Sequence, residues 1–435
     1  MNILVQLCRI LVGGLFIFSG MIKLNDPLGF SYKLQEYFSP EVLDLPVFMP
    51  YALGISIIVV VLEVLLGVFL LIGYKPKFTV YTILAMIIFF TFLTFYAAYF
   101  EVVKDCGCFG DFLPMKPWES FTKDVVLLVL ILVLVAGLKH IKPFLKTLPT
   151  TVIALLGFVF SLWFGYHVLT HLPVWDFRAY KIGDNLSANM TLPDNAQKEV
   201  SEYVWIFNVN GEDKEFKTSG NYPTVEGGKY VGYEKTVLVE ADEPKILDFS
   251  IESQEENLTQ HFLEVDNLVI VVAYNLNYTN VQGMKNIKIA TDKAIANGYQ
   301  VIGLTASGQD LKAKTIKDYG LNFEFYLCDE KVGKTIVRSN PGILTLAKGT
   351  VLDKEHYNDT ADLKLPKVGE PYVKPVVTPT KETLFFINDS IATKLEVNAL
   401  DPNNIEQMNV IKDSLLLKNK AYKNAESVIE ITLKK

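Results

Sequence analysis

Two cysteines separated by one glycine are the residues of this sequence best suited to chemistry. They lie in Asp105-Cys106-Gly107-Cys108-Phe109-Gly110-Asp111, between two long apolar runs. A disulfide between residues i and i+2 closes a very small ring, and the tight turn that it needs is one that Gly107 permits. Such strained disulfides are more oxidising and more labile than structural ones. Cys106 and Cys108 are therefore candidate catalytic thiols for disulfide exchange.

Two other interpretations of the pair stay open. In the first, the pair forms a static disulfide that only holds the loop together, although so small a ring stabilises a fold little. In the second it supplies two of four metal ligands, although no second cysteine pair or nearby histidine completes such a site. Apart from Lys104, the sequence places no basic residue beside the thiols to lower their pKa. We therefore assign no metal and no cofactor from these residues, and an enzymatic role stays open.

The chain of 435 residues divides near residue 172 into an apolar N-terminal part and a C-terminal part of ordinary soluble composition. Its net charge of −7 and the lack of a dense basic patch argue against a nucleic-acid partner. Four cysteines in the whole chain are too few for a disulfide-stapled scaffold. We predict a membrane protein, embedded in a lipid bilayer, with a large soluble tail.

Five apolar runs approach the length of about 20 residues that crosses a bilayer. They cover residues 1–24, 51–74, 78–100, 121–138 and 150–172. The connections at 74–77 and 139–149 carry lysines and no acids, so the positive-inside rule places them in the cytoplasm. Five spans then put the N-terminus inside, and the cysteine loop and the tail on the oxidising side. We expect a multi-pass bacterial inner-membrane protein with periplasmic C-terminal domains.

Charged residues within these runs are candidate structural or binding residues. Arg9 and Glu63 lie in the first and second runs, where charges are costly and usually face a partner. One hypothesis pairs Arg9 with Glu63. In the alternative, Arg9 reaches the cytoplasmic surface and Glu63 bonds a neighbouring helix. Asp124, which follows Lys123 near the outer end of the fourth run, is a further candidate.

Three segments of the apolar half carry a family pattern. They are Phe18-Ser19-Gly20-Met21-Ile22-Lys23-Leu24-Asn25-Asp26-Pro27-Leu28-Gly29-Phe30, residues 62–73, and Cys106-Gly107-Cys108-Phe109-Gly110-Asp111. The first two resemble the first and second helices of DoxX and MauE proteins, and the third resembles the paired-cysteine loop of the MauE-like branch. The resemblance covers about residues 1–143, and Lys23 within it is another candidate structural or binding residue.

This resemblance implies a membrane all-α four-helix bundle, to which the present chain adds a fifth transmembrane helix. The bundle would be related to quinone-linked disulfide-forming membrane proteins, so a quinone is an implied cofactor that no residue here demonstrates. MauE-like proteins are associated with disulfide formation or maturation of exported partners. The expected partners are thus exported or envelope proteins, or a separate thioredoxin-like protein with which Cys106 and Cys108 would exchange disulfides.

The soluble part begins with a predicted β-hairpin at residues 202–216. Asn210-Gly211 is the strongest short turn signal between two strands, and residues 236–240 predict another strand. From residue 246 strands and helices alternate, which predicts an α/β sheet covered on both faces. The predicted strands are 267–274, 299–305 and 323–328, and the predicted helices are 281–297, 311–319 and 330–337.

Asn340-Pro341, followed by an apolar strand and a Lys348-Gly349 turn, resembles the cis-proline region of the thioredoxin fold. This resemblance covers about residues 244–357. That fold carries Cys-x-x-Cys after its first strand, where this chain has Asn275-Leu276-Asn277-Tyr278-Thr279-Asn280. The domain therefore lacks the usual nucleophile, and Asn340 and Pro341 mark a candidate binding groove. Cys328 is interpreted as a buried structural thiol rather than a reactive one.

The C-terminal segment follows a proline-rich stretch that predicts a semi-rigid linker. Residues 400–413 and 428–435 resemble the plug domain of TonB-dependent outer-membrane receptors, which occurs detached in Bacteroidetes-type proteins. The resemblance implies a small α+β protein-contact module, with Asp401-Pro402 beginning a short helix and strands at 408–412 and 427–433. A small addition without a partner is the alternative. The predicted domains are 1–148, 149–172, 173–243, 244–360, 361–382 and 383–435.

Two hypotheses of function follow. In the first, an inner-membrane protein supports thiol/disulfide chemistry or maturation of exported proteins through its periplasm-facing Cys-Gly-Cys loop. In the second, it is a non-catalytic scaffold that binds envelope proteins through a degenerate thioredoxin-fold domain and a plug-like module. A transporter ranks third, because a single short bundle offers no repeat or broken helix.

Overall fold

The computed structural model describes most of the chain. The described residues are 2–103, 105, 107–144, 146–193, 195–368, 382–388, 390–392, 397, 405–411 and 425–433. They belong to two compact units, residues 1–368 and 369–435. Cys106, most of the predicted linker and the Asp401-Pro402 pair predicted to begin a helix lie outside the described residues.

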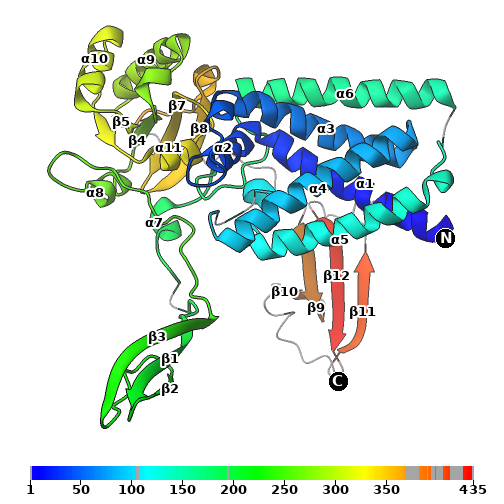
Figure 1. Ribbon diagram of the computed structural model, residues 1–435. Helices are drawn as coiled ribbons and strands as arrows, with labels where there is room; N and C mark the ends of the chain where they lie inside the picture. Colours follow the sequence, from blue (N-terminus) through cyan, green and yellow to red (C-terminus); the bar gives the residue numbers. More distant parts are fainter. Residues whose placement is uncertain are drawn as a thin grey trace. The chain divides into compact units, whose positions relative to one another are not determined.

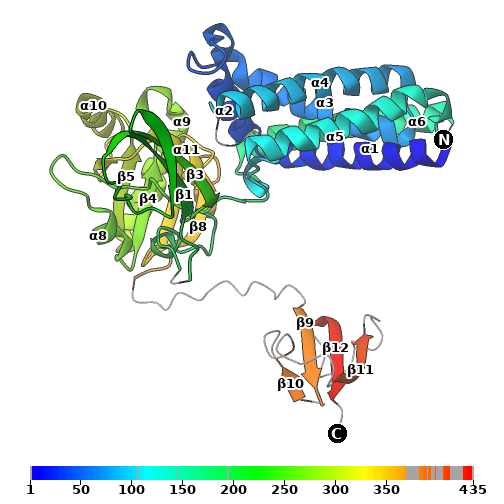
Figure 2. The ribbon, with the colours of Figure 1, turned by 60° about the horizontal axis from the view of Figure 1, so that its bottom comes forward.

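Long helices run side by side in the N-terminal part (Figures 1 and 2). They are α1 (Asn2–Asn25), α3 (Ala52–Ile72), α4 (Pro76–Phe100), α5 (Pro117–Ala136) and α6 (Thr147–Thr170). A shorter helix, α2 (Pro27–Phe38), was not predicted. The Asp26 carboxylate accepts a hydrogen bond from the Gly29 amide at 2.8 Å, and Pro27 fills the first helical position. This is a typical helix start, with a capping side chain and a preset proline φ.

Four of these helical segments are long and apolar enough to cross a membrane, among the described residues. They are Ile3–Asn25, Pro46–Ile72, Pro76–Phe100 and Thr147–Thr170. Helix α5 is not among these candidate spans because three charged residues, Glu119, Lys123 and Asp124, lie near its start. The structure therefore does not confirm a span at residues 121–138. The sidedness of the tail, which depends on five spans, stays a prediction.

Glycines bring α1 and α3 unusually close together. A Cβ added at Gly20 would lie 2.7 Å from Cγ2 of Val64, and one at Gly67 would lie 2.8 Å from the carbonyl oxygen of Gly13. Small residues allow such backbone approach between apolar helices. The contact fixes the register of α1 against α3, and with it the polar residues that meet between them.

A five-stranded sheet forms the centre of the α/β domain, in the order β6-β5-β4-β7-β8. Strands β4, β5 and β6 are parallel, whereas β7 is antiparallel to β4 and β8 is antiparallel to β7. The bounds are β4 Leu268–Val272, β5 Gln300–Thr305, β6 Phe325–Leu327, β7 Gly342–Ala347 and β8 Thr350–His356. The strands predicted at 267–274, 299–305 and 323–328 are confirmed.

Helices cover both faces of this sheet, as predicted. Helix α9 (Val281–Ala296) packs Met284 and Ile287 onto one face, where α10 (Gln309–Tyr319) also lies (Figure 1). On the other face, α8 (Thr259–Leu263) and α11 (Glu330–Ile336) contribute Phe262 and Ile336. The remaining short helices are α7 Leu186–Asn189, η1 Pro46–Tyr51, η2 Gly110–Phe112, η3 Leu138–His140, η4 Leu276–Tyr278 and η5 Thr360–Asp362.

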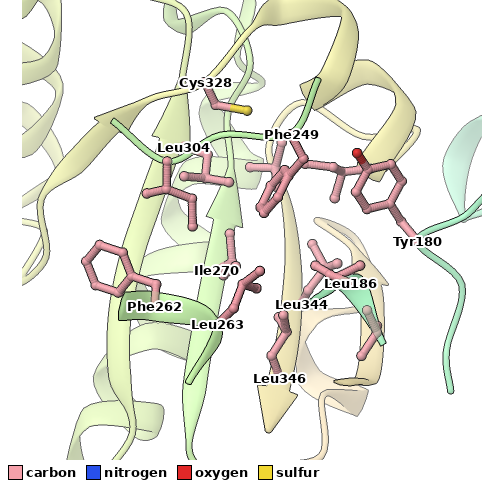
Figure 3. Close-up of a cluster of buried hydrophobic side chains, with 14 of the residues drawn as sticks. Tyr180, Leu186, Phe249, Phe262, Leu263, Ile270, Leu304, Cys328, Leu344 and Leu346 are labelled. Carbon is pink, nitrogen blue, oxygen red and sulfur yellow. The ribbon is translucent and has the colours of Figure 1, made fainter. Parts of the chain in front are cut away.

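Cys328 lies in the second of these cores. Figure 3 shows it with Phe249 and Leu304 in a cluster that Tyr180 and Leu186 also join. The residue is 2% exposed, and burial together with Asp329 raises the pKa of its thiol to about 12. A buried thiol of this kind is unreactive, which agrees with the interpretation of Cys328 as structural. Tyr180 and Leu186 reach this core from the segment predicted to belong to the preceding β-rich module.

The predicted hairpin is confirmed. Strands β1 (Val200–Val209) and β2 (Glu212–Thr218) pair around Asn210-Gly211, whose φ angles of 56° and 88° suit a two-residue turn. A third strand, β3 (Gly228–Val239), completes the order β2-β1-β3. In the C-terminal unit the order is β10-β9-β12-β11. These strands are β9 Glu382–Ile387, β10 Ser390–Ala392, β11 Ile405–Ile411 and β12 Ala425–Leu433.

Candidate functional site

Cys108 lies in the connection between α4 and α5, at one end of the helical bundle. Its side chain packs against an apolar cluster that includes Tyr37 and Leu93. Its carbonyl oxygen accepts a hydrogen bond from the Ser19 hydroxyl at 3.0 Å, which joins the loop to α1. The loop therefore packs against α1, α2 and α4 of the bundle, with the Cys108 side chain in the apolar cluster.

Lys123, in the second turn of α5, lies near Cys108. Its positive charge favours the Cys108 thiolate, and its ammonium group lies 2.9 Å from Oδ1 of Asp124. The other carboxylate oxygen of Asp124 accepts a hydrogen bond from the Thr94 hydroxyl of α4 at 3.1 Å. Asp124 is 1% exposed. A polar chain thus runs from Thr94 through Asp124 to Lys123, near the thiol.

This position of Lys123 corrects the sequence analysis, which found no basic residue beside the thiols other than Lys104. Lys123 is 15 positions from Cys108, and the fold of the loop onto α5 brings the two together. The available signal was the Lys123-Asp124 pair at the start of an otherwise apolar run, where a charge is costly without a partner. The predicted candidate Asp124 does contact the site, as the group that binds Lys123.

Opposing effects act on the Cys108 thiol. Burial is the largest and raises the thiol pKa above its usual value, and the negative charge of Asp124 acts in the same direction. Lys123 and Lys23 favour the thiolate and lower the pKa. The net direction is upward, so the thiol is mainly protonated at neutral pH and its two lysine neighbours moderate the effect of burial.

Gly107, which precedes Cys108, has a backbone conformation that favours glycine. Its φ is +64°, and an added Cβ would lie 3.1 Å from Cγ of Lys33. The Gly107 amide donates to Oδ1 of Asp105 at 3.2 Å, and Oδ2 of Asp105 lies 2.8 Å from the Lys33 ammonium group. A side chain at position 107 would be strained by the positive φ and crowded by Lys33. The loop is thereby fixed to α2.

Lys23 and Glu63 form an ion pair inside the bundle. Nζ of Lys23 lies 2.6 Å from Oε2 of Glu63, and the two side chains are 5% and 4% exposed. The ammonium group also lies 5.4 Å and 5.2 Å from the ring centroids of Phe30 and Phe90. Buried charges need such compensation. The Lys23 cation of this pair favours the Cys108 thiolate.

The hypothesis that Arg9 pairs with Glu63 is wrong. Arg9 is buried and donates instead to the carbonyl oxygens of Leu70 and Leu71, at 2.8 Å and 2.9 Å. These carbonyls belong to the last turn of α3, where the regular amide donors four residues further on are missing, and the Leu70 carbonyl also accepts from the Gly73 amide. Arg9 therefore caps the C-terminus of α3, which also suits its positive charge.

A pocket of about 580 Å³ lies between the helical bundle, the cysteine loop and the α/β domain. Gly107 and Gly110 of the loop form part of its wall. Much of the remaining wall comes from α1, α2, the segment after α6, and α11 with the residues that flank these helices, among them Lys23, Asp26, Lys33, Trp175, Lys334 and Arg338. The wall carries both signs of charge and several aromatic rings.

Arg338 joins the α/β domain to two parts of the bundle at this pocket. Its Nε lies 2.8 Å from Oδ2 of Asp26, and its Nη2 lies 3.3 Å from Oδ2 of Asp111 in the cysteine loop. The Arg338 side chain is 7% exposed. Close by, the hydroxyls of Tyr32 and Tyr274 share a hydrogen bond at 3.1 Å. The cysteine loop is therefore bound by the α/β domain through Arg338 as well as by the helical bundle.

A second ionic cluster holds the segment after α6 to the same domain. Oδ1 of Asp176 lies 2.7 Å from Nε of Arg178, and its other oxygen binds the Lys354 ammonium group. Lys354 also donates to the carbonyl oxygens of Tyr180 and Ile336, at 2.8 Å and 3.2 Å. Despite its burial, these cations hold the pKa of Asp176 at about 2.

The pKa of Asp176 predicts a loss of stability in acid. A carboxyl whose pKa is about 2 in the folded state and 3.8 when free stabilises the fold above pH 3.8. This contribution falls as the pH decreases from about 4 to 2. We expect Asp176→Asn to be less stable than the parent near pH 7 and to lose less stability over that acid interval. Urea unfolding of both proteins at several pH values measures the difference.

Asn340 and Pro341 lie beside the segment that follows β4. The peptide bond between them is cis, as predicted. The Asn340 side chain donates to the backbone carbonyl oxygen of Asn275 at 2.9 Å, and the Asn340 backbone carbonyl accepts from the Asn280 backbone amide at 3.0 Å. These contacts close the end of the sheet next to Tyr274, the residue that meets the bundle.

The described residues contain no group of three or more His, Cys, Asp or Glu side chains that could hold a metal ion. Residues 1–137 match the model of one protein family, described as methylamine utilisation protein MauE. The match covers the first helices and the cysteine loop, and it leaves the soluble domains unmatched. No curated protein and no solved structure matches the chain.

Proposed function

We propose that this chain is a membrane protein that supports thiol/disulfide chemistry, or maturation of exported proteins, through Cys106 and Cys108. The observation that carries the proposal is the setting of Cys108. The positive charge of Lys123 favours its thiolate, and its loop forms part of the wall of a pocket large enough for a peptide segment. Lysine next to a thiol is the electrostatic arrangement that favours a thiolate. The match of residues 1–137 to a MauE family model supports the same assignment.

The proposed exchange is balanced. A thiolate of a partner dithiol attacks the Cys106–Cys108 disulfide, a mixed disulfide forms, and the second partner thiolate resolves it. The partner loses two electrons and two protons, and the loop gains them as two thiols. A disulfide of a second, thioredoxin-like protein would then reoxidise the loop by the same exchange. In the proposed topology this takes place on the periplasmic side of a bacterial inner membrane.

A quinone fits the pocket poorly as the electron acceptor. Lysine, arginine and carboxylate side chains line much of the wall, among them Lys33, Asp105 and Lys334. An apolar quinone ring would have to displace water from these charges, which is unfavourable. We therefore derive no step through a quinone.

Replacement of both cysteines by serine tests this function. We expect the Cys106→Ser/Cys108→Ser protein to leave exported dithiol proteins more reduced, and single replacements to trap mixed disulfides with them. Differential alkylation of envelope proteins measures the first effect, and non-reducing gels measure the second. A Cys8→Ser protein is the control. Thiol states unchanged in the double variant, and no trapped partner, would rule out the redox function.

The second candidate function is a membrane-anchored scaffold, and the ionic contacts of Arg338 favour it. These contacts fix the α/β domain to the bundle at Asp26 and Asp111, in the manner of a structural junction. The sheet order β5-β4-β7-β8 with its antiparallel second half supports a thioredoxin-like domain. In this candidate function the domain and the C-terminal module bind envelope proteins, and the cysteine pair is a staple. The serine variant would then behave like the parent.

A further inference from the structure

We propose that one end of the helical bundle binds the phosphate group of an anionic phospholipid. An open pocket of about 780 Å³ lies there, between the start of α4 and η3. Three lysines and four less polar residues line it, namely Lys75, Lys77, Lys139, Pro76, Phe78, Leu138 and Ile141. The cysteine loop follows the opposite end of α4, so this site is independent of the proposed thiol chemistry.

The charge at this end of the bundle is entirely positive. No acidic side chain lines the pocket, and residues 1–25, 64–100 and 125–175 contain no Asp or Glu. All three stretches reach the end of the bundle at which α1 begins (Figures 1 and 2). Deeper in the bundle, by contrast, Lys23 pairs with Glu63 at 2.6 Å. A group of like charges without an internal counter-charge favours an anionic ligand.

Contacts from α1 hold the η3 side of the pocket in place. The Gln6 side chain donates to the carbonyl oxygen of His140 at 2.9 Å, and Nη1 of Arg9 donates to that of Lys142 at 3.1 Å. Ile141, which lies between these two carbonyls in the chain, is buried. On the other side, the start of α4 adds a partial positive charge, because no side chain caps it. The pocket is therefore formed before a ligand binds, which reduces the entropy lost on binding.

The pocket lies at the level where lipid headgroups are expected. The candidate span Pro46–Ile72 ends just before it, and the candidate spans Pro76–Phe100 and Thr147–Thr170 begin at or near it. Phe78 and Tyr81, about one helical turn apart on α4, are exposed and continue the pocket along the apolar surface of the span. An acyl chain can lie on this surface while its phosphate meets the lysines. Basic pockets at the cytoplasmic ends of spans bind anionic headgroups in this way.

The experiment measures lipid binding to the full-length protein in detergent by native mass spectrometry. Phosphatidylglycerol is the anionic probe, and phosphatidylcholine with the same acyl chains is the neutral one. Lys77→Gln/Lys139→Gln removes one cation from each side of the pocket. We expect phosphatidylglycerol to bind this variant about 25-fold more weakly, because each lysine near a membrane surface contributes about fivefold to the affinity for anionic lipid. Phosphatidylcholine should bind the parent and the variant equally.

Two control variants separate the pocket from the general charge of this end. Lys142→Gln/Lys146→Gln removes two exposed lysines that do not line the pocket, and it should change the affinity by less than about twofold. Lys77→Arg/Lys139→Arg keeps both charges, and it should bind phosphatidylglycerol at least as tightly as the parent, because guanidinium groups bind phosphate well.

Equal weakening in the two glutamine variants would overturn the inference, and so would a parent that binds the two lipids equally. The lysines would then act only as a signal for membrane orientation. Inorganic phosphate is the third probe, and displacement of phosphatidylglycerol by millimolar phosphate would assign the pocket to a soluble anion and overturn the lipid. Weak binding by the arginine variant would contradict a role of charge. If the pocket double variant fails to fold, Lys139→Gln alone replaces it, with an expected loss of about fivefold.

Discussion

Replacement of Arg338 by methionine is expected to loosen the α/β domain from the helical bundle. The Asp26 carboxylate, 19% exposed, would lose the guanidinium group that lies 2.8 Å away. Removing one partner of a buried ion pair costs about 3–5 kcal/mol. We expect about 3 kcal/mol, at the low end, because the second carboxylate, on Asp111, is 47% exposed and partly solvated. Urea unfolding of the protein in nanodiscs measures the free energy of unfolding.

Two companion variants make this result specific. Arg338→Lys keeps the charge but cannot reach Asp26 and Asp111 with separate nitrogens, so an intermediate loss is expected. Lys314→Met, which removes an exposed cation elsewhere in the same domain, should change the stability by less than about 0.5 kcal/mol. A methionine variant as stable as the Lys314→Met control would contradict the role of Arg338 as the junction.

The buried pair of Lys23 and Glu63 should show strong coupling. Lys23→Met alone leaves a carboxylate without its cation, and Glu63→Leu alone leaves an ammonium group without its anion. Each single change should cost about 3–5 kcal/mol, whereas replacement of a buried pair by apolar residues is often neutral. We therefore expect the double variant to be close to the parent in stability. Unfolding of the four proteins gives the coupling energy as a double-mutant cycle.

The same cycle also distinguishes this pair from the alternative that Glu63 pairs with Arg9. Arg9 donates to carbonyls at the end of α3, so Arg9→Met should weaken the fold equally in the presence and absence of Glu63. Additive losses for Lys23→Met and Glu63→Leu would show that the ion pair contributes no coupling. A coupling between Arg9 and Glu63 would point to a different register of α1 against α3.

The register of α1 against α3 could have been predicted from the sequence. In a pair of antiparallel helices, the residue numbers of two facing positions add to a nearly constant sum. Gly20 faces Val64 and Ile17 faces Gly67, and these two pairs have the same sum. With the same sum, Glu63 faces residue 21 of α1, which is less than one helical turn from Lys23. Arg9 is 12 residues further along α1, about 18 Å away at 1.5 Å per residue. A search for glycines that allow close approach would have predicted the correct pair.

Local patterns predicted most elements, whereas the candidate site depends on contacts between distant segments. Continuous apolar runs, the Asn210-Gly211 turn and the alternation after residue 246 led to the correct helices and strands. The contacts of Arg338 with Asp26 and Asp111 join residues more than 200 positions apart, and no local pattern marks them. Helix α2 was missed because it is too short to cross a membrane and lies in the connection between two long apolar runs, although Asp26-Pro27 is a helix-start signal.

The reduction potential of the Cys106–Cys108 pair tests the proposed function most directly. The full-length protein is equilibrated in a series of thiol redox buffers, and mass spectrometry of the loop peptide measures the fraction that is oxidised. An exchanging disulfide should have a potential well above about −300 mV, the level below which structural disulfides lie. A potential below that level, or a pair that never forms a disulfide, would contradict disulfide exchange and favour the scaffold function instead.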